Sequence, residues 1–213
     1  MFKGYFFDLD GVVFNSEPHY SEFWGSVGKT YLPDMADFSL RIKGQTLVEI
    51  YDRFFNGPLK AERARITEAL NAFERKMPYE YIPGFECFIQ SLRKENVRTA
   101  VVTSSNQAKM RNVYRQHPEF TPLFDAILTS EDFSRSKPDP EGYLMAAKRF
   151  KLKPEDCVGF EDSVNGLRSV RSAGMTVVGL ATTNALDVVR PLCDVAIKDF
   201  TELKSAANIG PRK

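Results

Sequence analysis

Two carboxylates end an apolar run near the beginning of the sequence. Residues 5–7 are Tyr-Phe-Phe, and Asp8, Leu9, Asp10 and Gly11 follow directly. Three consecutive aromatic side chains are typical of a strand that is buried on both faces, as in a parallel sheet. Because ligands bind at the carboxyl ends of strands in open α/β sheets, we expect Asp8 and Asp10 to lie at a binding site. An acidic turn after a buried strand is the alternative, and the motif alone does not decide between them.

The composition predicts a folded chain with a small ligand. With 213 residues, the chain has room for one sizeable domain or for one domain that carries an insertion. Its 43% hydrophobic and 27% charged residues are ordinary for a globular protein. A net charge near +1 favours neither a nucleic acid nor an anionic membrane, so we expect no such partner.

The cysteines and the first residues predict a cytoplasmic protein. Cys87, Cys157 and Cys193 are odd in number, far apart and without a CxxC pair. We therefore expect reduced thiols that pack in the core, rather than disulfides or a zinc site. Met1 runs almost directly into the first predicted strand, which leaves no room for a signal peptide, and no apolar run is long enough to span a bilayer.

Predicted strands and helices alternate after residue 81. The helix expected at residues 139–150 should bury Tyr143, Leu144 and Ala147. The alternation predicts an α/β fold, namely a doubly wound parallel sheet with right-handed crossovers and helices on both faces. The expected strands are residues 97–103, 125–129, 157–160, 176–180 and 195–197, and the expected helices are residues 85–96, 106–116, 139–150 and 163–173.

Residues 15–80 show helical patterns and no convincing strand. Ser16 is expected to cap the first of these helices, and residues 61–76 have the pattern of a long, charged amphipathic helix. We predict a small all-α domain at residues 15–80, inserted into an α/β core of residues 1–14 and 81–213.

Candidate catalytic groups follow four of the predicted strands. Residues 103–106 follow the second strand, Lys137 lies in the loop after the third, and Glu161 and Asp162 follow the fourth. Because the carboxyl ends of parallel strands share one edge of the sheet, we expect these groups to converge with the two N-terminal aspartates. Ordinary capping residues and a solvated loop around Lys137 are the alternative explanation.

The chemistry of these groups predicts phosphoryl transfer. Clustered carboxylates repel one another unless a cation neutralises them, and oxygen ligands favour Mg²⁺. Thr103, the Ser104 backbone N–H and Lys137 offer hydrogen-bond donors and a positive charge, as a phosphate group requires. A carboxylate beside such a metal and phosphate site indicates covalent phosphoryl transfer.

The same residues resemble four ordered motifs of the haloacid dehalogenase-like superfamily. The matching segments are residues 7–11, 102–104, 137–138 and 159–163. The chain is most similar to the β-phosphoglucomutase-like branch, whose members carry an α-helical cap of the first type. The resemblance implies a haloacid dehalogenase-like core of the doubly wound kind, with residues 15–80 as the cap.

The resemblance also implies a role for each motif residue. Asp8 would attack the phosphoryl group, and Asp10 would act as general acid and then as general base. Thr103 and Lys137 would stabilise the transferring phosphoryl oxygens. Leu9 and Ser104 belong to the implied phosphate site. The implied ligands of a Mg²⁺ cofactor are Asp8, the Asp10 backbone carbonyl, Asp162 and, directly or through water, Glu161.

The predicted cap departs from the mutase pattern. Trp24 and Lys43 resemble mutase residues, but residues 45–47 lack the mutase arginine, and Asn106 stands where the mutase has a lysine. Both changes remove a cation that would hold a second phosphate. The mutase histidine is displaced by one position, at His19.

We therefore predict a Mg²⁺-dependent phosphatase of small phosphorylated metabolites, with a mutase as the alternative and an inactive phosphate-binding relative as a third possibility. Closure of the cap would exclude water. We expect a monomer whose partner is a small phosphorylated molecule. Packing within the cap is the alternative role for Trp24, and a hinge position is the alternative for His19. The candidate substrate contacts are Glu17, His19, Trp24, Lys43 and Asn106.

Overall fold

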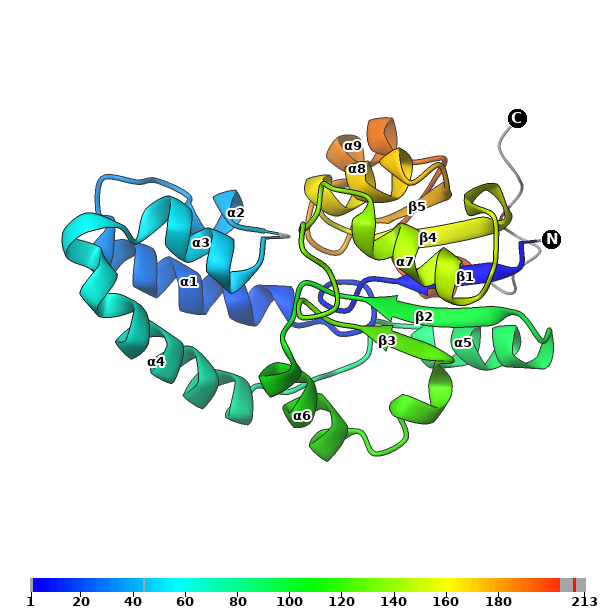
Figure 1. Ribbon diagram of the computed structural model, residues 1–213, viewed down its shortest axis with the longest axis horizontal. Coiled ribbons are helices and arrows are strands. Elements are labelled where there is room, and N and C mark those ends of the chain that lie inside the picture. Colours follow the sequence, from blue (N-terminus) through cyan, green and yellow to red (C-terminus); the bar gives the residue numbers. More distant parts are fainter. Residues whose placement is uncertain (1, 44, 204–208, 210–213) are drawn as a thin grey trace.

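A parallel sheet forms the centre of the molecule. The computed structural model describes residues 2–43, 45–203 and 209. Within these residues the sheet has six strands in the order β3-β2-β1-β4-β5-β6, so the first strand lies in the middle (Figure 1). The strands are β1 (Gly4–Phe7), β2 (Arg98–Val102), β3 (Ala126–Leu128), β4 (Cys157–Glu161), β5 (Thr176–Leu180) and β6 (Val195–Ile197). The predicted α/β fold is confirmed.

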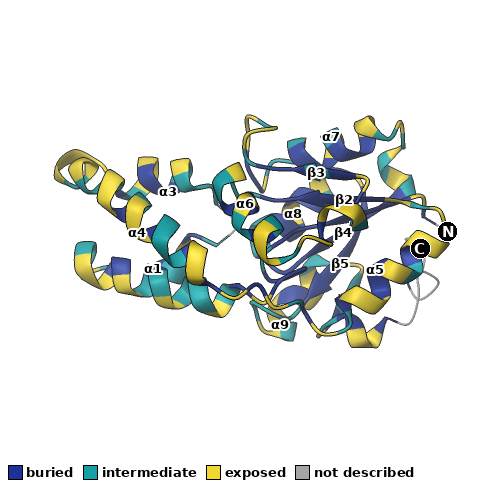
Figure 2. Cartoon of the chain, turned by 90° about the horizontal axis from the view of Figure 1, so that it is seen from below, coloured by how far each residue is buried: buried dark blue, intermediate teal, exposed yellow. Residues whose placement is uncertain are grey.

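Helices cover both faces of this sheet. Alternate side chains of β1 point to opposite faces: Tyr5 and Phe7 pack with α5 and α6, and Phe6 packs with α7, α8 and α9. The strands β1, β4 and β5 are accordingly buried along their whole length, and the sheet interior is buried (Figure 2). The helices are α5 (Phe85–Lys94), α6 (Gln107–Gln116), α7 (Glu141–Arg149), α8 (Val164–Ser172) and α9 (Leu186–Val189). Burial of the aromatic strand from both sides explains its composition.

Two expectations about packing are wrong. Leu144 is exposed, because the buried face of α7 runs through Tyr143 and Ala147 while Leu144 lies about 100° round the helix from Tyr143. The cysteines are not all in the core: Cys157 is buried, but Cys87 lies on the exposed side of α5 and Cys193 is half-buried. All three thiols are free, as predicted.

Four helices extend beyond the carboxyl ends of the strands (Figure 1). We call α1 (Glu17–Tyr31), α2 (Phe38–Arg41), α3 (Leu47–Phe54) and α4 (Arg63–Lys76) the cap helices. They share an apolar cluster of their own, which includes Trp24, Phe38, Phe55 and Ile66. The position of Ser16 before α1 was predicted, but its side chain does not cap the helix. Its hydroxyl donates a hydrogen bond to Asp10 instead.

Two chain segments join the cap helices to the sheet, and they lie side by side. The backbone N–H of Asn15 donates to the Glu80 carbonyl at 2.8 Å, and that of Ile82 donates to the Val13 carbonyl at 2.9 Å. Phe14 stacks on the Tyr81 ring beside these bonds. In the part of the chain that the structure describes, no helix has the length and apolar character that crossing a membrane requires.

Candidate active site

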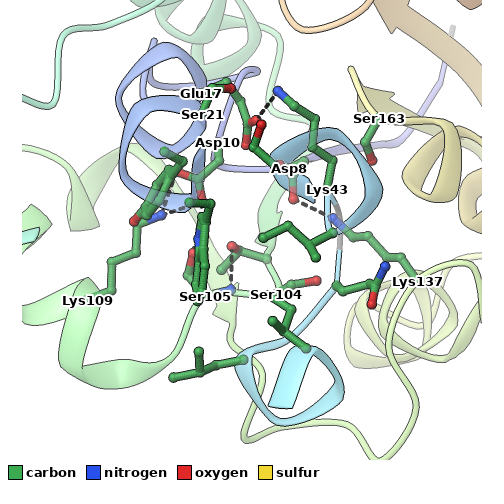
Figure 3. Close-up of a pocket in the computed structure, with 18 of the residues that line it drawn as sticks. Asp8, Asp10, Glu17, Ser21, Lys43, Ser104, Ser105, Lys109, Lys137 and Ser163 are labelled. Carbon is green, nitrogen blue, oxygen red and sulfur yellow. Dashed lines mark hydrogen bonds and ion pairs between the residues drawn. The ribbon is translucent and has the colours of Figure 1, made fainter. Parts of the chain in front are cut away.

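The four predicted strand ends converge on one cavity. Asp8 follows β1, Thr103 follows β2, Lys137 lies after β3 and Asp162 follows β4. All four line a cavity of about 130 Å³ between the sheet edge and the cap helices. This volume exceeds about tenfold the 10–15 Å³ that one water molecule needs, so the cavity has room for a small ligand. Figure 3 shows the polar side chains that point into it.

Lys137 is held by three oxygen atoms at the floor of the cavity. Its ammonium group donates to Asp8 Oδ1 and, at 2.9 Å, to the Val102 carbonyl oxygen, and it lies 2.6 Å from Glu161 Oε1. Burial alone would lower the pKa of Lys137. The carboxylates of Asp8 and Glu161 outweigh burial and raise that pKa above its ordinary value. Lys137 therefore keeps its positive charge, next to the carboxylate that was predicted to react.

The carboxylates around Lys137 carry more negative charge than one lysine can offset. Burial, helped by Glu161 and Asp10 and opposed by Lys137, raises the pKa of Asp8 to about 7. The pKa of Asp162 is raised well above its usual range by burial and by the nearby charges of Glu17 and Asp8. A divalent cation at this position would relieve the repulsion and lower both pKa values.

The donor atoms at this position fit such a cation. One carboxylate oxygen from each of Asp8, Glu161 and Asp162 lies within 4.8 Å of the others. Asp162 Oδ2 is buried and has no hydrogen-bond partner among the described residues. Gly11, with φ +76°, leaves space there, because a β-carbon at residue 11 would overlap the Asp162 carboxylate. An unpartnered buried carboxylate oxygen is costly, and a bound cation would satisfy it.

The Glu161 carboxylate lies beside Lys137 in the interior of the protein. Its Oε1 atom accepts a hydrogen bond of 2.6 Å from the Tyr143 hydroxyl and pairs with Lys137. The carboxylate is fully buried against Gly166 of α8, where a β-carbon would overlap it. Unlike Asp8 and Asp162, Glu161 is not among the described residues that line the cavity. Its main contact is therefore with Lys137, which it helps to hold next to Asp8.

Asp10 is surrounded by hydrogen-bond donors. Its carboxylate accepts from the hydroxyls of Ser16 and Ser105 and, through both oxygens, from the ammonium group of Lys109. Burial by itself would raise the pKa of Asp10. The charge of Lys109 and these hydrogen bonds outweigh burial and hold the pKa below its usual range. Asp10 is thus ionised in this geometry.

Lys109 connects Asp10 to two cap helices. Its ammonium group lies 4.4 Å from the centre of the Tyr20 ring on α1, and the Tyr20 hydroxyl donates to Glu74 of α4 at 2.8 Å. Lys109 and Glu74 are both buried. Neither Lys109 nor Glu74 was predicted to lie at the site, because both belong to strongly charged helices whose pattern indicates exposure to solvent.

Most of the predicted substrate contacts line the cavity. Glu17 and Lys43 form an ion pair of 2.6 Å, and Trp24 is buried between the cavity and the ring of Phe38. Asn106 lines the cavity and caps α6 by accepting from the Lys109 backbone N–H at 2.9 Å.

Only some of the remaining predicted contacts line the cavity. Thr103 and Ser104 line the cavity, and the Thr103 hydroxyl accepts from the Ser105 N–H at 3.0 Å. The Leu9 side chain is fully buried in the core of the sheet. His19 is half-buried on α1 and is not among the described residues that line the cavity.

The cap helices contact the core directly over this site. The Ser136 hydroxyl, next to Lys137, donates to Glu49 at the start of α3. The side-chain amide of Asn165 in α8 donates to the Lys43 backbone carbonyl at 3.4 Å. The cavity is therefore roofed by the loop between α2 and α3.

These motifs and this fold agree with a comparison against known protein families. The model of the haloacid dehalogenase-like hydrolases matches residues 2–174. This chain belongs to the haloacid dehalogenase-like hydrolase family. The resemblance in the four motifs is thereby confirmed.

Relatives within the family include both phosphatases and mutases. The chain is 30% identical to validoxylamine A 7′-phosphate phosphatase of Streptomyces hygroscopicus subsp. limoneus, over 99% of this chain and 100% of the relative. It is 27% identical to β-phosphoglucomutase of Bacillus subtilis, over 84% of this chain and 83% of that protein. The crystal structure of a HAD hydrolase of family IA, variant 3, from Entamoeba histolytica superimposes with a TM-score of 0.79 at 22% identity. The superposition covers 94% of this chain and 95% of the other, which supports the fold.

Proposed function

We propose that this chain is a Mg²⁺-dependent phosphatase of small phosphorylated metabolites, with an aspartyl-phosphate intermediate on Asp8. The observation that supports this most strongly is the contact between Asp8 and Lys137 beside the unpartnered carboxylate oxygen of Asp162. A nucleophilic carboxylate, a cation for the phosphoryl oxygens and a ligand for a metal thus lie at one end of the cavity.

The first half of the reaction breaks the substrate ester. The Asp8 carboxylate attacks phosphorus, and the bond from phosphorus to the leaving oxygen breaks as the new bond forms. Asp10, once protonated, gives its proton to the leaving oxygen. Lys137 and Thr103 stabilise the charge that develops on the phosphoryl oxygens. A divalent cation bound by Asp8, the Asp10 carbonyl and Asp162 would supply further positive charge to these oxygens.

The second half regenerates the enzyme. Asp10, now ionised, takes a proton from a water molecule, which attacks the phosphorus of the aspartyl-phosphate. The bond between phosphorus and Asp8 breaks, and inorganic phosphate leaves. The ion pair between Asp10 and Lys109 favours the ionised state that this second half needs.

A β-phosphoglucomutase-type mutase is the second candidate, because the Bacillus subtilis relative is named as such an enzyme. The phosphatase is preferred because a relative that aligns over its full length is named as a phosphatase, of validoxylamine A 7′-phosphate. Loss of activity is the third possibility. It finds no support in the site, where Asp8, Asp10 and Lys137 are all in place.

We also propose the division of the chain that the sequence suggested. Residues 15–80 form the cap, and residues 1–14 and 81–213 form the catalytic core. The paired segments around Val13 and Ile82 would be the hinge, since both connections run through them. Closure would exclude water from the cavity. The monomeric state and the cytoplasmic location stay predictions.

Release of phosphate from p-nitrophenyl phosphate tests this proposal. We expect hydrolysis that requires Mg²⁺ and falls by at least about 10³-fold in Asp8→Asn, because the nucleophile is lost. Asp34→Asn, at an exposed position in the cap, is the matched control and should keep full activity. A parallel assay for conversion of β-glucose 1-phosphate to glucose 6-phosphate separates the mutase. Efficient conversion with little free phosphate would reverse the assignment.

A further inference from the structure

Each cation that the described residues contribute to the cavity is already paired with a carboxylate. These cations are Lys43, Lys109 and Lys137. Lys137 pairs with Asp8 and Glu161, and Lys109 pairs with Asp10. Lys43, in the roof, pairs with Glu17 at 2.6 Å. Lys137 lies next to Asp8 and would hold the transferred phosphate, and the described residues that line the cavity offer no further cation outside an ion pair.

The Glu17–Lys43 ion pair places one negative and one positive charge at the roof of the cavity. Only 17% of the Glu17 side chain and 13% of the Lys43 side chain are exposed, so solvent screens the pair poorly. Glu17 lies in the first turn of α1, and its negative charge contributes to the raised pKa of Asp162. Figure 3 shows the pair next to Asp8. A substrate group that approaches Lys43 therefore also meets the negative charge of Glu17.

Lys109 has an ion-pair partner and a second carboxylate nearby. Asp10 holds its ammonium group on the core side. Burial raises the pKa of Glu74 above its usual range, and the nearby positive charge of Lys109 opposes that rise. Tyr20 links the two groups, since its ring lies over the Lys109 ammonium group and its hydroxyl donates to Glu74. The second candidate cation is thus also unavailable to an anionic ligand.

The other side chains around the cavity are neutral. Ser21, Ser39, Gln45 and Asn106 offer hydroxyl and amide groups that can form hydrogen bonds with ligand hydroxyls. Trp24, Ile42, Leu47, Ile50 and Leu70 supply apolar surface. Apolar walls with a few polar groups are typical of sites for small, uncharged molecules or uncharged parts of molecules.

We infer that this site selects phosphomonoesters whose remaining part is uncharged and carries hydroxyl groups, and that Glu17 is the residue that excludes a second phosphate. This inference rests on the proposed function. A second phosphate would lie near Glu17 or Glu74, and like charges without counter-ions disfavour binding strongly. A mutase must hold two phosphoryl groups on one ligand when it phosphorylates a sugar phosphate, so this charge arrangement also opposes mutase activity.

Removing first the charge of Glu17 and then that of Lys43 tests the inference. Isothermal titration calorimetry with Mg²⁺ and the non-hydrolysing Asp8→Asn protein compares glucose 6-phosphate with glucose 1,6-bisphosphate. We expect the monophosphate to bind about tenfold more tightly. Adding Glu17→Gln frees Lys43 and should shift the ratio about tenfold toward the bisphosphate. Adding Lys43→Gln as well removes that cation, and the preference for the monophosphate should return.

The possible outcomes separate this inference from the proposed function. Equal or tighter binding of the bisphosphate before Glu17 is changed, no binding of glucose 6-phosphate, or no shift on Glu17→Gln would overturn the inference. Phosphate release from p-nitrophenyl phosphate by the unmodified enzyme is measured separately and tests the proposed function alone. If all the expected binding shifts are observed but the unmodified enzyme releases no phosphate, the inferred selectivity is supported and the phosphatase proposal is rejected.

Discussion

At the scale of single residues, the position of Lys109 determines how Asp10 can act. Both Asp10 oxygens face the ammonium group of Lys109, and the pKa of Asp10 is held low although burial opposes this. An ionised carboxylate can accept a proton from water but has none to give to a leaving group. In the proposed reaction, Asp10 would therefore have to separate from Lys109 and gain a proton before the first half.

Replacing Lys109 should move the pH profile of the enzyme. In Lys109→Met the charge that lowers the pKa of Asp10 is gone while burial remains, so that pKa rises. Protonated Asp10 then persists to higher pH, and the alkaline decline of kcat/KM for glucose 6-phosphate should move to higher pH. Lys94→Met, at an exposed position on α5, is the control and should leave the profile unchanged. An unshifted profile in Lys109→Met would show that Asp10 is not the titrating acid.

The sequence was informative where a residue follows a buried strand. Asp8, Thr103, Lys137 and Asp162 could be placed together because parallel strands bring their ends to one edge. Lys109 and Glu74 could not be found, since each sits in a charged helix and becomes buried only because α4 and α6 pack against each other. The role of Ser16 was missed for a similar reason: its hydroxyl has a tertiary partner, Asp10, in place of the local backbone.

At the scale of secondary-structure elements, α8 is shaped by the carboxylate beneath it. Gly166 lies in its first turn, where the helix passes over Glu161. Ser163 caps this helix, and its hydroxyl accepts from the Gly166 N–H at 3.0 Å. A glycine inside a helix normally lowers stability, but here the absence of a side chain lets Glu161 reach Tyr143 and Lys137.

Two glycine-to-alanine substitutions should therefore have opposite effects. Gly25 in α1 has open space around its β-position, so Gly25→Ala should raise the free energy of unfolding by about 0.5–1 kcal/mol. Gly166→Ala would overlap the Glu161 carboxylate and should lower that free energy by about 1–3 kcal/mol. Urea denaturation measures both variants. A stabilised Gly166→Ala would mean that Glu161 is free to move aside.

The order of elements was also readable from the sequence, and the orientation of helices less so. The predicted strand at residues 97–103 is observed as Arg98–Val102, because β-branched residues between polar boundaries mark a buried strand clearly. Leu144 was wrongly predicted to face the sheet. The smaller residues Ala146 and Ala147 pack there instead.

At the scale of the whole molecule, the buried carboxylates of the site lower the free energy of unfolding, and a bound metal ion would offset this loss. The pKa values of Asp8 and Asp162 are raised in the folded protein, so at neutral pH folding must hold charges that the unfolded chain leaves in water. Between about pH 4 and 7 the folded state binds protons that the unfolded state has already lost. Without metal, stability should therefore fall as pH rises through this window.

Mg²⁺ should reverse this trend. Bound as proposed, it would contact the ionised carboxylates, so the rise in Tm that it causes should be large at pH 8 and small at pH 5. At about 100 times its Kd, Mg²⁺ adds about 2.7 kcal/mol to the free energy of unfolding. Calorimetry with Mg²⁺ or with EDTA at the two pH values measures the difference. Asp162→Asn removes a ligand and should abolish most of the Mg²⁺ effect; a pH-independent shift would place the metal elsewhere.

The central place of β1 links activity to protein synthesis. Gly4 to Phe7 are joined on one side to Arg98 to Val101 and on the other to Cys157 to Phe160. On the ribosome, the segment that carries Asp8 emerges before β2 and β4, and it cannot pair with these strands until both have been translated. A nascent chain that has not yet exposed residue 161 has no finished catalytic edge, so a partly made enzyme cannot hydrolyse the cell's phosphate esters.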